Sequence, residues 1–572
     1  LAAYVTDGRR AGIAYADVTT GEFAATEVQQ ATATSELERI APAELLVPDG
    51  LGAEANQLPG FVSRCPEDYF EHAKARATLL KHFGARTLAP FGLARWPLAA
   101  SAAGALLAYL SETQNVAAGQ LTRLTSYHTE NYMALDSATV RSLEIFESAG
   151  GAPSLLGTLD RTRTAMGGRT LRRWLRQPLL DVAEITRRQE YVAWFVANAE
   201  ARAEFCAALE SVHDLERLSA RAQAGMATAH EVLALAQSLE ALPRLRAVLQ
   251  RDAKRFGATL AALPACDAAA KLIRAAIRDE LPTRADGTNI IREGFSQELD
   301  GLRELLRSGK TFLAEMEQRE RARTGIKSLR VGYNKVFGYS IEVTRPNLRL
   351  VPDDYTRKQT LAQSERFVTL ELKEYETLVL NSQERMSELE TGLFRRVCAE
   401  IGRGRKEIQA AAATVAEMDA IASFAEASDE FDYVRPRVSD TPALRIVGGR
   451  HPVLERAVGD NSFVANDTDL GGDGAPEIAL ITGPNMSGKS TYLRQTALIV
   501  LMAQAGCFVP ASEAAVGLCD RVFTRIGLYD RIGGGESTFM TEMVETAQIL
   551  HHATPRSLIL LDELGRGTST YD

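Results

Sequence analysis

The sequence predicts a multidomain protein that combines small α/β domains with a mainly helical centre. Its 572 residues exceed what one hydrophobic core usually supports, which favours roughly three to five domains. The composition, 45% hydrophobic and 24% charged, excludes disordered, collagen-like and membrane-embedded chains. The third observation is a change of pattern along the chain, from short β-like runs to helical segments rich in Ala, Leu and Arg, and then to long apolar runs.

Residues 1–108 predict a small α/β domain. Short β-like runs alternate there with turns that contain glycine, and residues 34–38 favour the start of a helix. The predicted strands are 4–5, 12–16, 22–24 and 45–47.

Two features of the chain indicate a cytoplasmic protein. The six cysteines are widely spaced without a CxxC pair, which favours reduced thiols over disulfides or a zinc site. The longest uncharged apolar stretch, residues 96–111, has 16 residues and falls short of the ~20 that cross a bilayer. The chain begins at Leu1 without a signal peptide and ends at Asp572 within an expected loop, so we interpret it as a fragment.

Residues 109–320 and 374–435 predict a helical core with two long lever helices. Apolar residues between 386 and 418 keep a near-heptad spacing. This spacing is typical of one continuous helix of ~50 residues, about 75 Å long. Gly402 and Gly404 are expected to weaken that helix locally.

The segment 321–373, between these helices, predicts a β-rich head on an antiparallel lever, with a hairpin around 334–338. Eleven basic residues oppose five acidic ones in this segment, although the whole chain carries a formal charge of −9. Such a local surplus is typical of a surface that binds nucleic-acid phosphates without reading sequence. The alternative is a solvated charged face on exposed helices. The candidate contacts are Lys327, Arg330, Lys335, Arg345, Arg349, Arg357 and Lys358.

Residues 436–572 predict a second α/β domain, which contains a P-loop. The apolar runs 478–482 and 557–561 are typical of strands buried on both faces of a parallel sheet. The P-loop pattern follows the first run and precedes a helical stretch, the context in which backbone amides bind phosphates. The alternative is a glycine-rich turn. The expected nucleotide-binding residues are Gly483, Pro484, Asn485, Met486, Ser487, Gly488, Lys489, Ser490 and Thr491.

The second apolar run ends in two acids that complete this site. Asp562 is expected to join the Ser490 hydroxyl in holding Mg²⁺, while Lys489 reaches the β- and γ-phosphates of ATP. Glu563 is placed to orient or deprotonate the attacking water. Taken alone, a hydrophobic strand that ends in Asp-Glu is common, so this assignment depends on the P-loop.

A third glycine-rich segment, residues 533–538, precedes a stretch compatible with a helix. Its Ser537 is a candidate anion ligand at a helix N-terminus. One subunit does not need two phosphate loops, so we expect this loop to cap the nucleotide of a partner subunit. The alternative is a flexible loop with an ordinary serine cap.

These motifs together resemble the MutS family of DNA mismatch repair proteins. Residues 482–491 (TGPNMSGKST) are similar to the family's ATP-binding loop, and 536–543 and 562–569 are similar to its later ATPase motifs. Residues 164–169 resemble its core-domain motif, and 331–339 resemble its clamp.

The resemblance implies an ABC-type ATPase domain that forms two composite sites in a homodimer. By that analogy Ser537 faces the γ-phosphate bound to the other subunit, Asn485 lines the nucleotide, and Phe463 stacks on adenine; the alternative for Phe463 is an ordinary core aromatic. The implied cofactors are ATP and Mg²⁺, and the implied partners are mismatched double-stranded DNA and MutL. The expected domains are a connector (1–108), a core with the first lever (109–320), a clamp (321–373), a returning lever (374–435) and the ATPase domain (436–572).

Two departures from the family pattern affect the expected activity. The family's N-terminal domain, whose Phe-x-Glu motif wedges into the mismatch, is expected to be absent, so this sequence does not predict mismatch recognition. The chain also ends before the family's later histidine loop and C-terminal helices, so we expect poor nucleotide binding and slow hydrolysis. One alternative function is that of a MutS relative acting on recombination junctions. The other is a structural DNA ATPase of the SMC or Rad50 kind, in which the P-loop and signature lie at opposite chain ends; here Ser537 follows Lys489 by only 48 residues.

Overall fold

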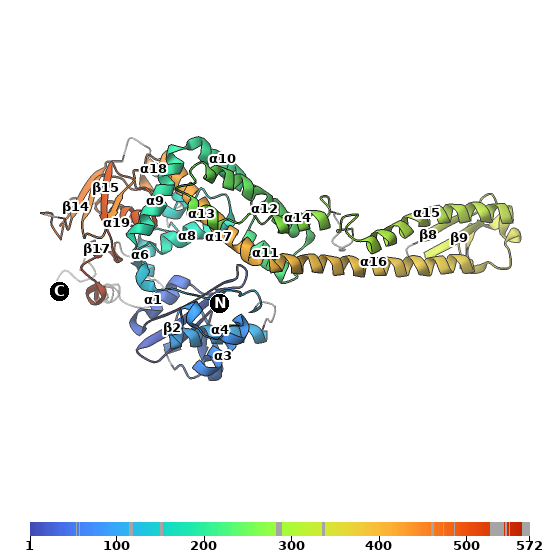
Figure 1. Cartoon of the computed structure of the whole chain (residues 1–572), viewed down its shortest axis with the longest axis horizontal. Coiled ribbons are helices and arrows are strands. Elements are labelled where there is room, and N and C mark those ends of the chain that lie inside the picture. Colours follow the sequence, from blue (N-terminus) through green and yellow to red (C-terminus); the bar gives the residue numbers. More distant parts are fainter. Residues whose placement is uncertain are drawn as a thin grey trace. The chain divides into compact units, whose positions relative to one another are not determined.

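The computed structural model describes residues 1–52, 54–55, 58–113, 118–148, 153–281, 289–334, 338–458, 463–472, 474–484, 487–526, 543, 546–547 and 549–562. These residues form two compact units (Figure 1). Unit 1 comprises residues 1–226, 237–266 and 404–572, and unit 2 comprises residues 227–236 and 267–403.

Unit 1 begins with the predicted small α/β domain, whose six-stranded sheet has the order β5-β4-β1-β2-β3-β6. Strands β1 to β3 are antiparallel, and the outer strands pair in parallel. The strands are β1 (Ala2–Thr6), β2 (Arg10–Asp17), β3 (Glu22–Gln29), β4 (Glu44–Pro48), β5 (Phe61–Cys65) and β6 (Thr125–Ser126). The helices are α1 (Gln30–Ile40), α2 (Glu67–Phe70), α3 (His72–Phe83), η2 (Ala89–Phe91) and α4 (Pro97–Thr113). The four predicted strands are confirmed, whereas α1 begins earlier than predicted and α4 continues beyond residue 108.

Helix α4 contains most of the uncharged apolar stretch noted at 96–111, and it packs on β2 and against α3. Glycine is required at both contacts. A Cβ at Gly12 would lie 2.1 Å from the backbone of Leu98, and a Cβ at Gly104 would lie 2.4 Å from Ala75 Cα. None of the described helices is long and apolar enough to span a membrane.

The helical part of unit 1 is organised around α17 (Arg405–Glu430), most of which is buried. Helices α8, α9 and α11 pack against it. All six cysteines lie in the described parts of the chain, where they are buried and form no disulfide. The remaining elements are η3 (Thr129–Asn131), β7 (Ala134–Leu135), α6 (Ser137–Ser142), α7 (Leu155–Leu159), α8 (Ala165–Arg176), α9 (Val182–Ala197), α10 (Ala199–Leu209), α11 (Leu215–Gln223), α12 (Ala229–Gln250, which begins in unit 2) and α13 (Gly257–Ala262).

Buried Asp419 joins α17 to the start of α8. Its carboxylate accepts hydrogen bonds from the amides of Arg163 and Thr164 and from the Thr164 hydroxyl, which lies 2.7 Å away. Thr164 in turn caps α8 by accepting a hydrogen bond from the amide of Gly167. The core-domain motif therefore encodes a helix start that is fixed by a buried carboxylate.

We expect Gly167→Ala to destabilise the protein by about 1–3 kcal/mol, the usual range for overpacking. The new Cβ would lie 2.1 Å from Asp419 Oδ2, and the hydrogen bonds of Asp419 prevent that carboxylate from moving away. The matched control is Gly168→Ala in the same helix, where the nearest atom is the Thr162 hydroxyl at 3.3 Å. Urea denaturation should show a lower midpoint for Gly167→Ala only; equal midpoints would contradict the assigned close contact.

In unit 2, α15 (Gln297–Thr324) and α16 (Leu370–Arg403) lie side by side beyond α14 (Asp267–Ala276). Glu298 pairs with Arg385 at 2.6 Å, and Arg319, near the other end of α15, pairs with Glu371 at 2.5 Å. The two helices are therefore antiparallel, as predicted. The prediction of one continuous helix through residues 386–418 is wrong. Because Gly404 lacks a side chain and has low helix propensity, α16 ends before it and α17 begins after it.

The predicted β-rich head is an antiparallel four-stranded sheet in the order β10-β11-β9-β8. One face packs on α15 and α16 through an apolar cluster that includes Met316, Ile341 and Phe367. The hairpin is confirmed, with Asn334 of β8 opposite Gly338 of β9. The elements are β8 (Arg330–Asn334), β9 (Gly338–Thr344), η4 (Arg345–Leu350), β10 (Thr356–Thr360) and β11 (Ser364–Val368).

The C-terminal part of unit 1 has two small sheets, β12-β15-β13-β14 and β17-β16-β7, and helix α19. The strand predicted at 557–561 is β17, but it is not buried on both faces as predicted, because Ile559 is 39% and Leu561 43% exposed. The strand predicted at 478–482 is wrong: Ile478 is 86% and Leu480 90% exposed, and the segment is not in a strand. An apolar run forms a buried strand only where other elements cover it. Among the described residues β17 is the edge strand of its sheet, so residues 478–482 do not pair beside it. The elements are β12 (Arg437–Ser439), β13 (Leu444–Gly449), α18 (Leu454–Val458), β14 (Asn466–Leu470), α19 (Lys489–Ala505), β15 (Glu513–Gly517), β16 (Arg521–Arg525) and β17 (Ser557–Leu561).

Candidate functional site

The P-loop residues lead directly into the N-terminus of α19. Gly488 is the N-cap and has a φ of 93°, a conformation that side chains rarely adopt. The amide of Ser487 donates to Pro484 O at 3.3 Å, and the Lys489 ammonium group donates to Gly483 O at 2.8 Å. The lysine side chain therefore folds back along the loop that the sequence assigns to phosphates.

The structure brings together the two predicted magnesium ligands, which are far apart in the sequence. The Ser490 hydroxyl, in the first turn of α19, donates to Asp562 Oδ2 at 2.5 Å. Asp562 follows β17, and its amide donates to Arg525 O at 2.7 Å, which continues the parallel pairing of β16 and β17. A carboxylate and a hydroxyl are hard oxygen ligands of the kind that Mg²⁺ prefers.

The donor set fits a magnesium ion held jointly with a nucleotide. In the part of the chain that the structure describes, no group of three or more His, Cys, Asp or Glu residues is arranged to hold a metal. Mg²⁺ commonly binds through one or two protein oxygens and completes its shell with water and substrate phosphates. The pair Ser490 and Asp562 beside a P-loop matches that pattern.

Two further contacts of α19, which the sequence did not indicate, connect the P-loop to its surroundings. The Tyr492 hydroxyl lies 2.8 Å from Thr468 Oγ1 in β14, the strand that follows half-buried Phe463. At the other end of α19, the Gln504 side chain donates to Leu179 O and Cys519 O. The helix is thus fixed at both ends to other elements of unit 1.

Buried Arg188 makes the contact between the end of α19 and the helical core. Its guanidinium group donates to Ala505 O at 3.1 Å and lies over the Trp174 ring, 3.7 Å from the centroid. Burial lowers the pKa of Arg188 to about 10, so the group remains charged at neutral pH. Arg188 therefore connects the end of α19 to α8 and α9.

Several predicted site residues lie outside the described residues, so their roles remain predictions. They are Asn485 and Met486 of the P-loop, Ser537, Glu563, and Lys335 of the clamp hairpin.

Basic residues of unit 2 gather around η4. Ser328, which follows Lys327, is within 3.1 Å of Thr344 Oγ1, and Asn347 Nδ2 donates to both hydroxyls. These bonds hold the turn after α15 against η4. They bring together Lys327, Arg345 and Arg349, which we call the basic turn; all three are exposed and make no ion pair among the described residues.

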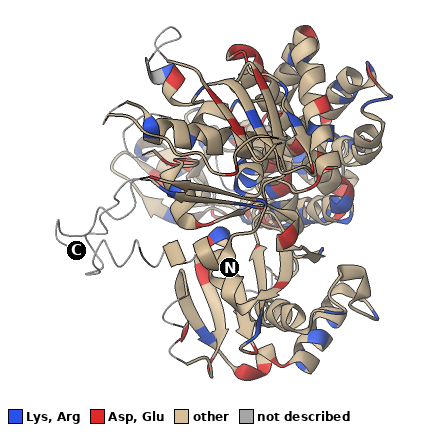
Figure 2. Ribbon diagram, turned by 90° about the vertical axis from the view of Figure 1, so that its left-hand side faces the viewer, with Lys and Arg blue, Asp and Glu red and all other residues tan. Residues whose placement is uncertain are grey.

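The surplus of six positive charges counted along residues 321–373 is smaller in the structure, because acidic side chains lie close to several of these basic residues. Lys358 lies 3.4 Å from Glu376, a carboxylate outside that segment, and Arg357 lies 3.8 Å from Glu365. Arg330 lies opposite Glu342 in the sheet register. Figure 2 shows that over unit 1, too, Lys and Arg are interspersed with Asp and Glu. The basic turn is therefore the stronger candidate for phosphate contacts.

Comparison with known proteins gives a consistent result over nearly the whole chain. Residues 1–123 match the model of MutS domain II, residues 138–425 that of MutS domain III, and residues 479–572 that of MutS domain V.

Similar proteins include three named DNA mismatch repair protein MutS. The one from Symbiobacterium thermophilum is 48% identical, over 98% of this chain and 66% of that protein. Those from Dehalococcoides mccartyi (strain BAV1) and Myxococcus xanthus are 45% and 46% identical, each over 100% of this chain, and over 67% and 66% of their own lengths. The chain spans about two thirds of the length of these relatives.

Proposed function

The chain belongs to the MutS family, and we propose that it acts in DNA mismatch repair as an ATPase that binds duplex DNA. The observation that carries the proposal is the hydrogen bond between Ser490 and Asp562. Nucleotide hydrolysis of this kind uses a cation bound to the phosphates, and a hydroxyl and a carboxylate that lie together beside the P-loop support such a site.

In this proposal the domain that contains the P-loop is an ABC-type ATPase. The loop amides and Lys489 bind the phosphates of ATP, while Ser490 and Asp562 hold Mg²⁺, which neutralises charge on those phosphates when it is bound. Glu563 orients the attacking water. Asn485 lines the nucleotide, Phe463 stacks on adenine, and Ser537 of a second copy completes the site in a homodimer. The similarity of the motifs to those of the family supports these roles.

We further propose that the clamp contacts mismatched double-stranded DNA in the cytoplasm and that MutL is a partner, as the family implies. Support for the DNA contact comes from the basic turn, whose charges are exposed and have no ion-pair partner among the residues that the structure describes. Contacts with phosphates hold any duplex irrespective of its sequence, which suits a protein that scans DNA. The path from the P-loop through α19 to Arg188 is the route by which nucleotide binding would reach the helical core.

We expect the triple variant Lys327→Ala, Arg345→Ala and Arg349→Ala to bind matched and mismatched duplexes more weakly by a similar factor. If each residue contacts one phosphate, the slope of log K against log salt should become shallower by about 2–3. Fluorescence anisotropy over about 50–200 mM salt measures both quantities.

The comparison variant is Arg357→Ala with Lys358→Ala. It should have the smaller effect, because each of these side chains already has a carboxylate partner. Unchanged affinity and slope in the triple variant would contradict the proposed DNA contact.

A further inference from the structure

A side chain of the P-loop helix, Tyr492, holds the strand that follows Phe463. Tyr492 lies in the first turn of α19, and its amide donates to Gly488 O at 2.9 Å. Its hydroxyl group donates to Asp467 O at 3.2 Å and lies 2.8 Å from Thr468 Oγ1. A phenol carries a single hydrogen, so the Thr468 hydroxyl is the donor in the shorter bond. Tyr492 thus bonds to two consecutive residues of β14.

Strand β14 has support from its sheet on one side only. Among the described residues it is the edge strand of the order β12-β15-β13-β14, and its pairing with β13 shifts register between Ile446 and Gly449. Thr468 is 5% exposed, and Tyr492 is the one partner that the described part of the chain gives its hydroxyl group. A buried hydroxyl group without a partner is costly. The position of β14 is therefore tied to that of the P-loop helix.

Phe463, the candidate adenine contact, lies close to this bond along the chain. It is half-buried and precedes β14 by three residues. Four residues of extended chain span at most about 14 Å, so the bond at Asp467 limits how far Phe463 can lie from α19. The phosphates of a nucleotide would bind at the start of the same helix, beside Ser490. Tyr492 therefore connects the two segments that would hold the two ends of a nucleotide.

We propose that Tyr492 is a positioning residue for the nucleotide, a role that rests on the function proposed above. Its hydroxyl group fixes the separation between the P-loop, which binds the phosphates, and the segment of Phe463, which binds the adenine. A ligand that makes two linked contacts binds tightly only when the separation of its sites matches its own length. Without the hydroxyl group, ATP should lose affinity, whereas inorganic triphosphate, which needs the P-loop alone, should not.

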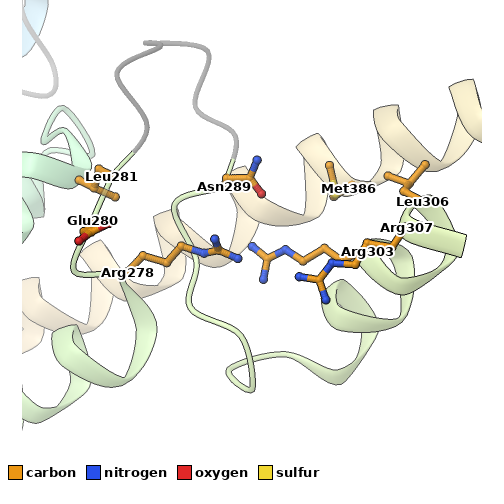
Figure 3. A pocket seen from close by; sticks show the side chains of 8 residues that line it. All are labelled: Arg278, Glu280, Leu281, Asn289, Arg303, Leu306, Arg307 and Met386. Carbon is orange, nitrogen blue, oxygen red and sulfur yellow. The ribbon is translucent and has the colours of Figure 1, made fainter. Parts of the chain in front are cut away.

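A cluster of arginines in unit 2 does not compete for inorganic triphosphate. Arg278, Arg303 and Arg307 line a cavity of about 520 Å³, and Figure 3 shows that the guanidinium group of Arg278 points toward those of the other two. These guanidinium groups lie within 3.9 Å of the carboxylates of Glu293, Asp300, Glu304 and Glu390. The cavity therefore has no positive surplus, and we expect inorganic triphosphate to report on the P-loop.

Isothermal titration calorimetry with ATP and with inorganic triphosphate, each with Mg²⁺, tests the two ends of the site separately. Tyr492→Phe removes the hydroxyl group and keeps the ring. We expect this variant to bind ATP about five- to tenfold more weakly, the effect of one hydrogen bond, and to bind inorganic triphosphate as the unchanged protein does. Thr468→Val should weaken ATP binding in the same way, whereas Thr468→Ser keeps a hydroxyl group and should retain the affinity.

The matched control is Tyr191→Phe in α9, because the Tyr191 hydroxyl makes the same two kinds of bond outside the nucleotide site. It donates to Arg255 O at 3.4 Å and accepts from the hydroxyl group of buried Thr259 at 3.2 Å. Both phenylalanine variants should lower the melting temperature slightly, but only Tyr492→Phe should change the affinity for ATP. This difference separates positioning from a general loss of stability.

Two results would overturn the positioning role and leave the P-loop assignment intact. One is an unchanged affinity of Tyr492→Phe for ATP, and the other is an equal loss of affinity for ATP and for inorganic triphosphate. Failure of the unchanged protein to bind either ligand would overturn the proposed function together with this role.

Discussion

Replacement of Asp562 by asparagine is expected to lower magnesium-dependent ATP turnover by about 10²–10³-fold, the effect of removing one key electrostatic contact from an active site. The carboxylate lies 2.5 Å from the Ser490 hydroxyl, and in the proposed site it would supply the negative charge that holds the cation. An asparagine keeps the size and one oxygen but removes that charge. Steady-state turnover measured across a magnesium titration should show a lower maximal rate. It should also show weaker binding of magnesium, so that a higher magnesium concentration is needed for the half-maximal rate.

The matched control for Asp562→Asn is Asp520→Asn at the opposite end of the same pair of strands. Asp520 precedes β16 and accepts hydrogen bonds from Thr554 and Ser557, far from the P-loop in the sheet register. It should leave turnover nearly unchanged. Glu563→Gln provides the contrast, because a residue that acts on water should lower turnover while magnesium affinity is retained. Normal turnover in Asp562→Asn would refute the assigned cation site.

The proximity of Ser490 and Asp562 was predictable because both of the signals for it are local. A P-loop places its serine in the first turn of the following helix, and an apolar strand that ends in an acid places that acid at the edge of a sheet. The structure brings Ser490 and Asp562 together as those two rules require. The hairpin at Asn334 and Gly338 was predictable for the same reason. The alternation of apolar and polar residues and the turn residues that predict a hairpin all lie within a few positions of one another.

The errors concern properties that depend on distant neighbours. The run at 478–482 is as apolar as β17, but burial requires covering strands that no local pattern supplies. The charge surplus of the clamp was overestimated because Lys358 pairs with Glu376, beyond the segment in which charges were counted. Asp419 reaches Thr164 across 255 residues. A single sequence gives no signal for such partners.

Glu390→Ala is expected to produce the largest loss of stability in unit 2, about 3–5 kcal/mol, as when one partner of a buried ion pair is removed. Glu390 is 0% exposed and accepts hydrogen bonds from Arg303 and from the amides of Asn289 and Ile291. Truncation leaves two amides without acceptors, and the buried guanidinium of Arg303 keeps only the more exposed carboxylate of Asp300, 3.3 Å away, as a counter-charge. Hydrogen exchange of residues 289–292 should accelerate together with a fall in the urea midpoint of unit 2. The control is Glu388→Ala, an exposed position on the same helix.

A double replacement separates two explanations for the stability lost in Glu390→Ala. Either the ion pair between Glu390 and Arg303 stabilises unit 2, or stability falls only because one buried charge remains when its partner is removed. Buried ion pairs that are exchanged for apolar residues of similar volume often leave stability unchanged or increase it, because the desolvation cost of both charges disappears. Glu390→Leu with Arg303→Met should therefore recover most of the stability lost in Glu390→Ala, although the two amides still lack an acceptor. A double variant as unstable as Glu390→Ala would show that the carboxylate acts mainly by holding the backbone of residues 289–291. Equal stability of Glu390→Ala and Glu388→Ala would refute the buried pair altogether.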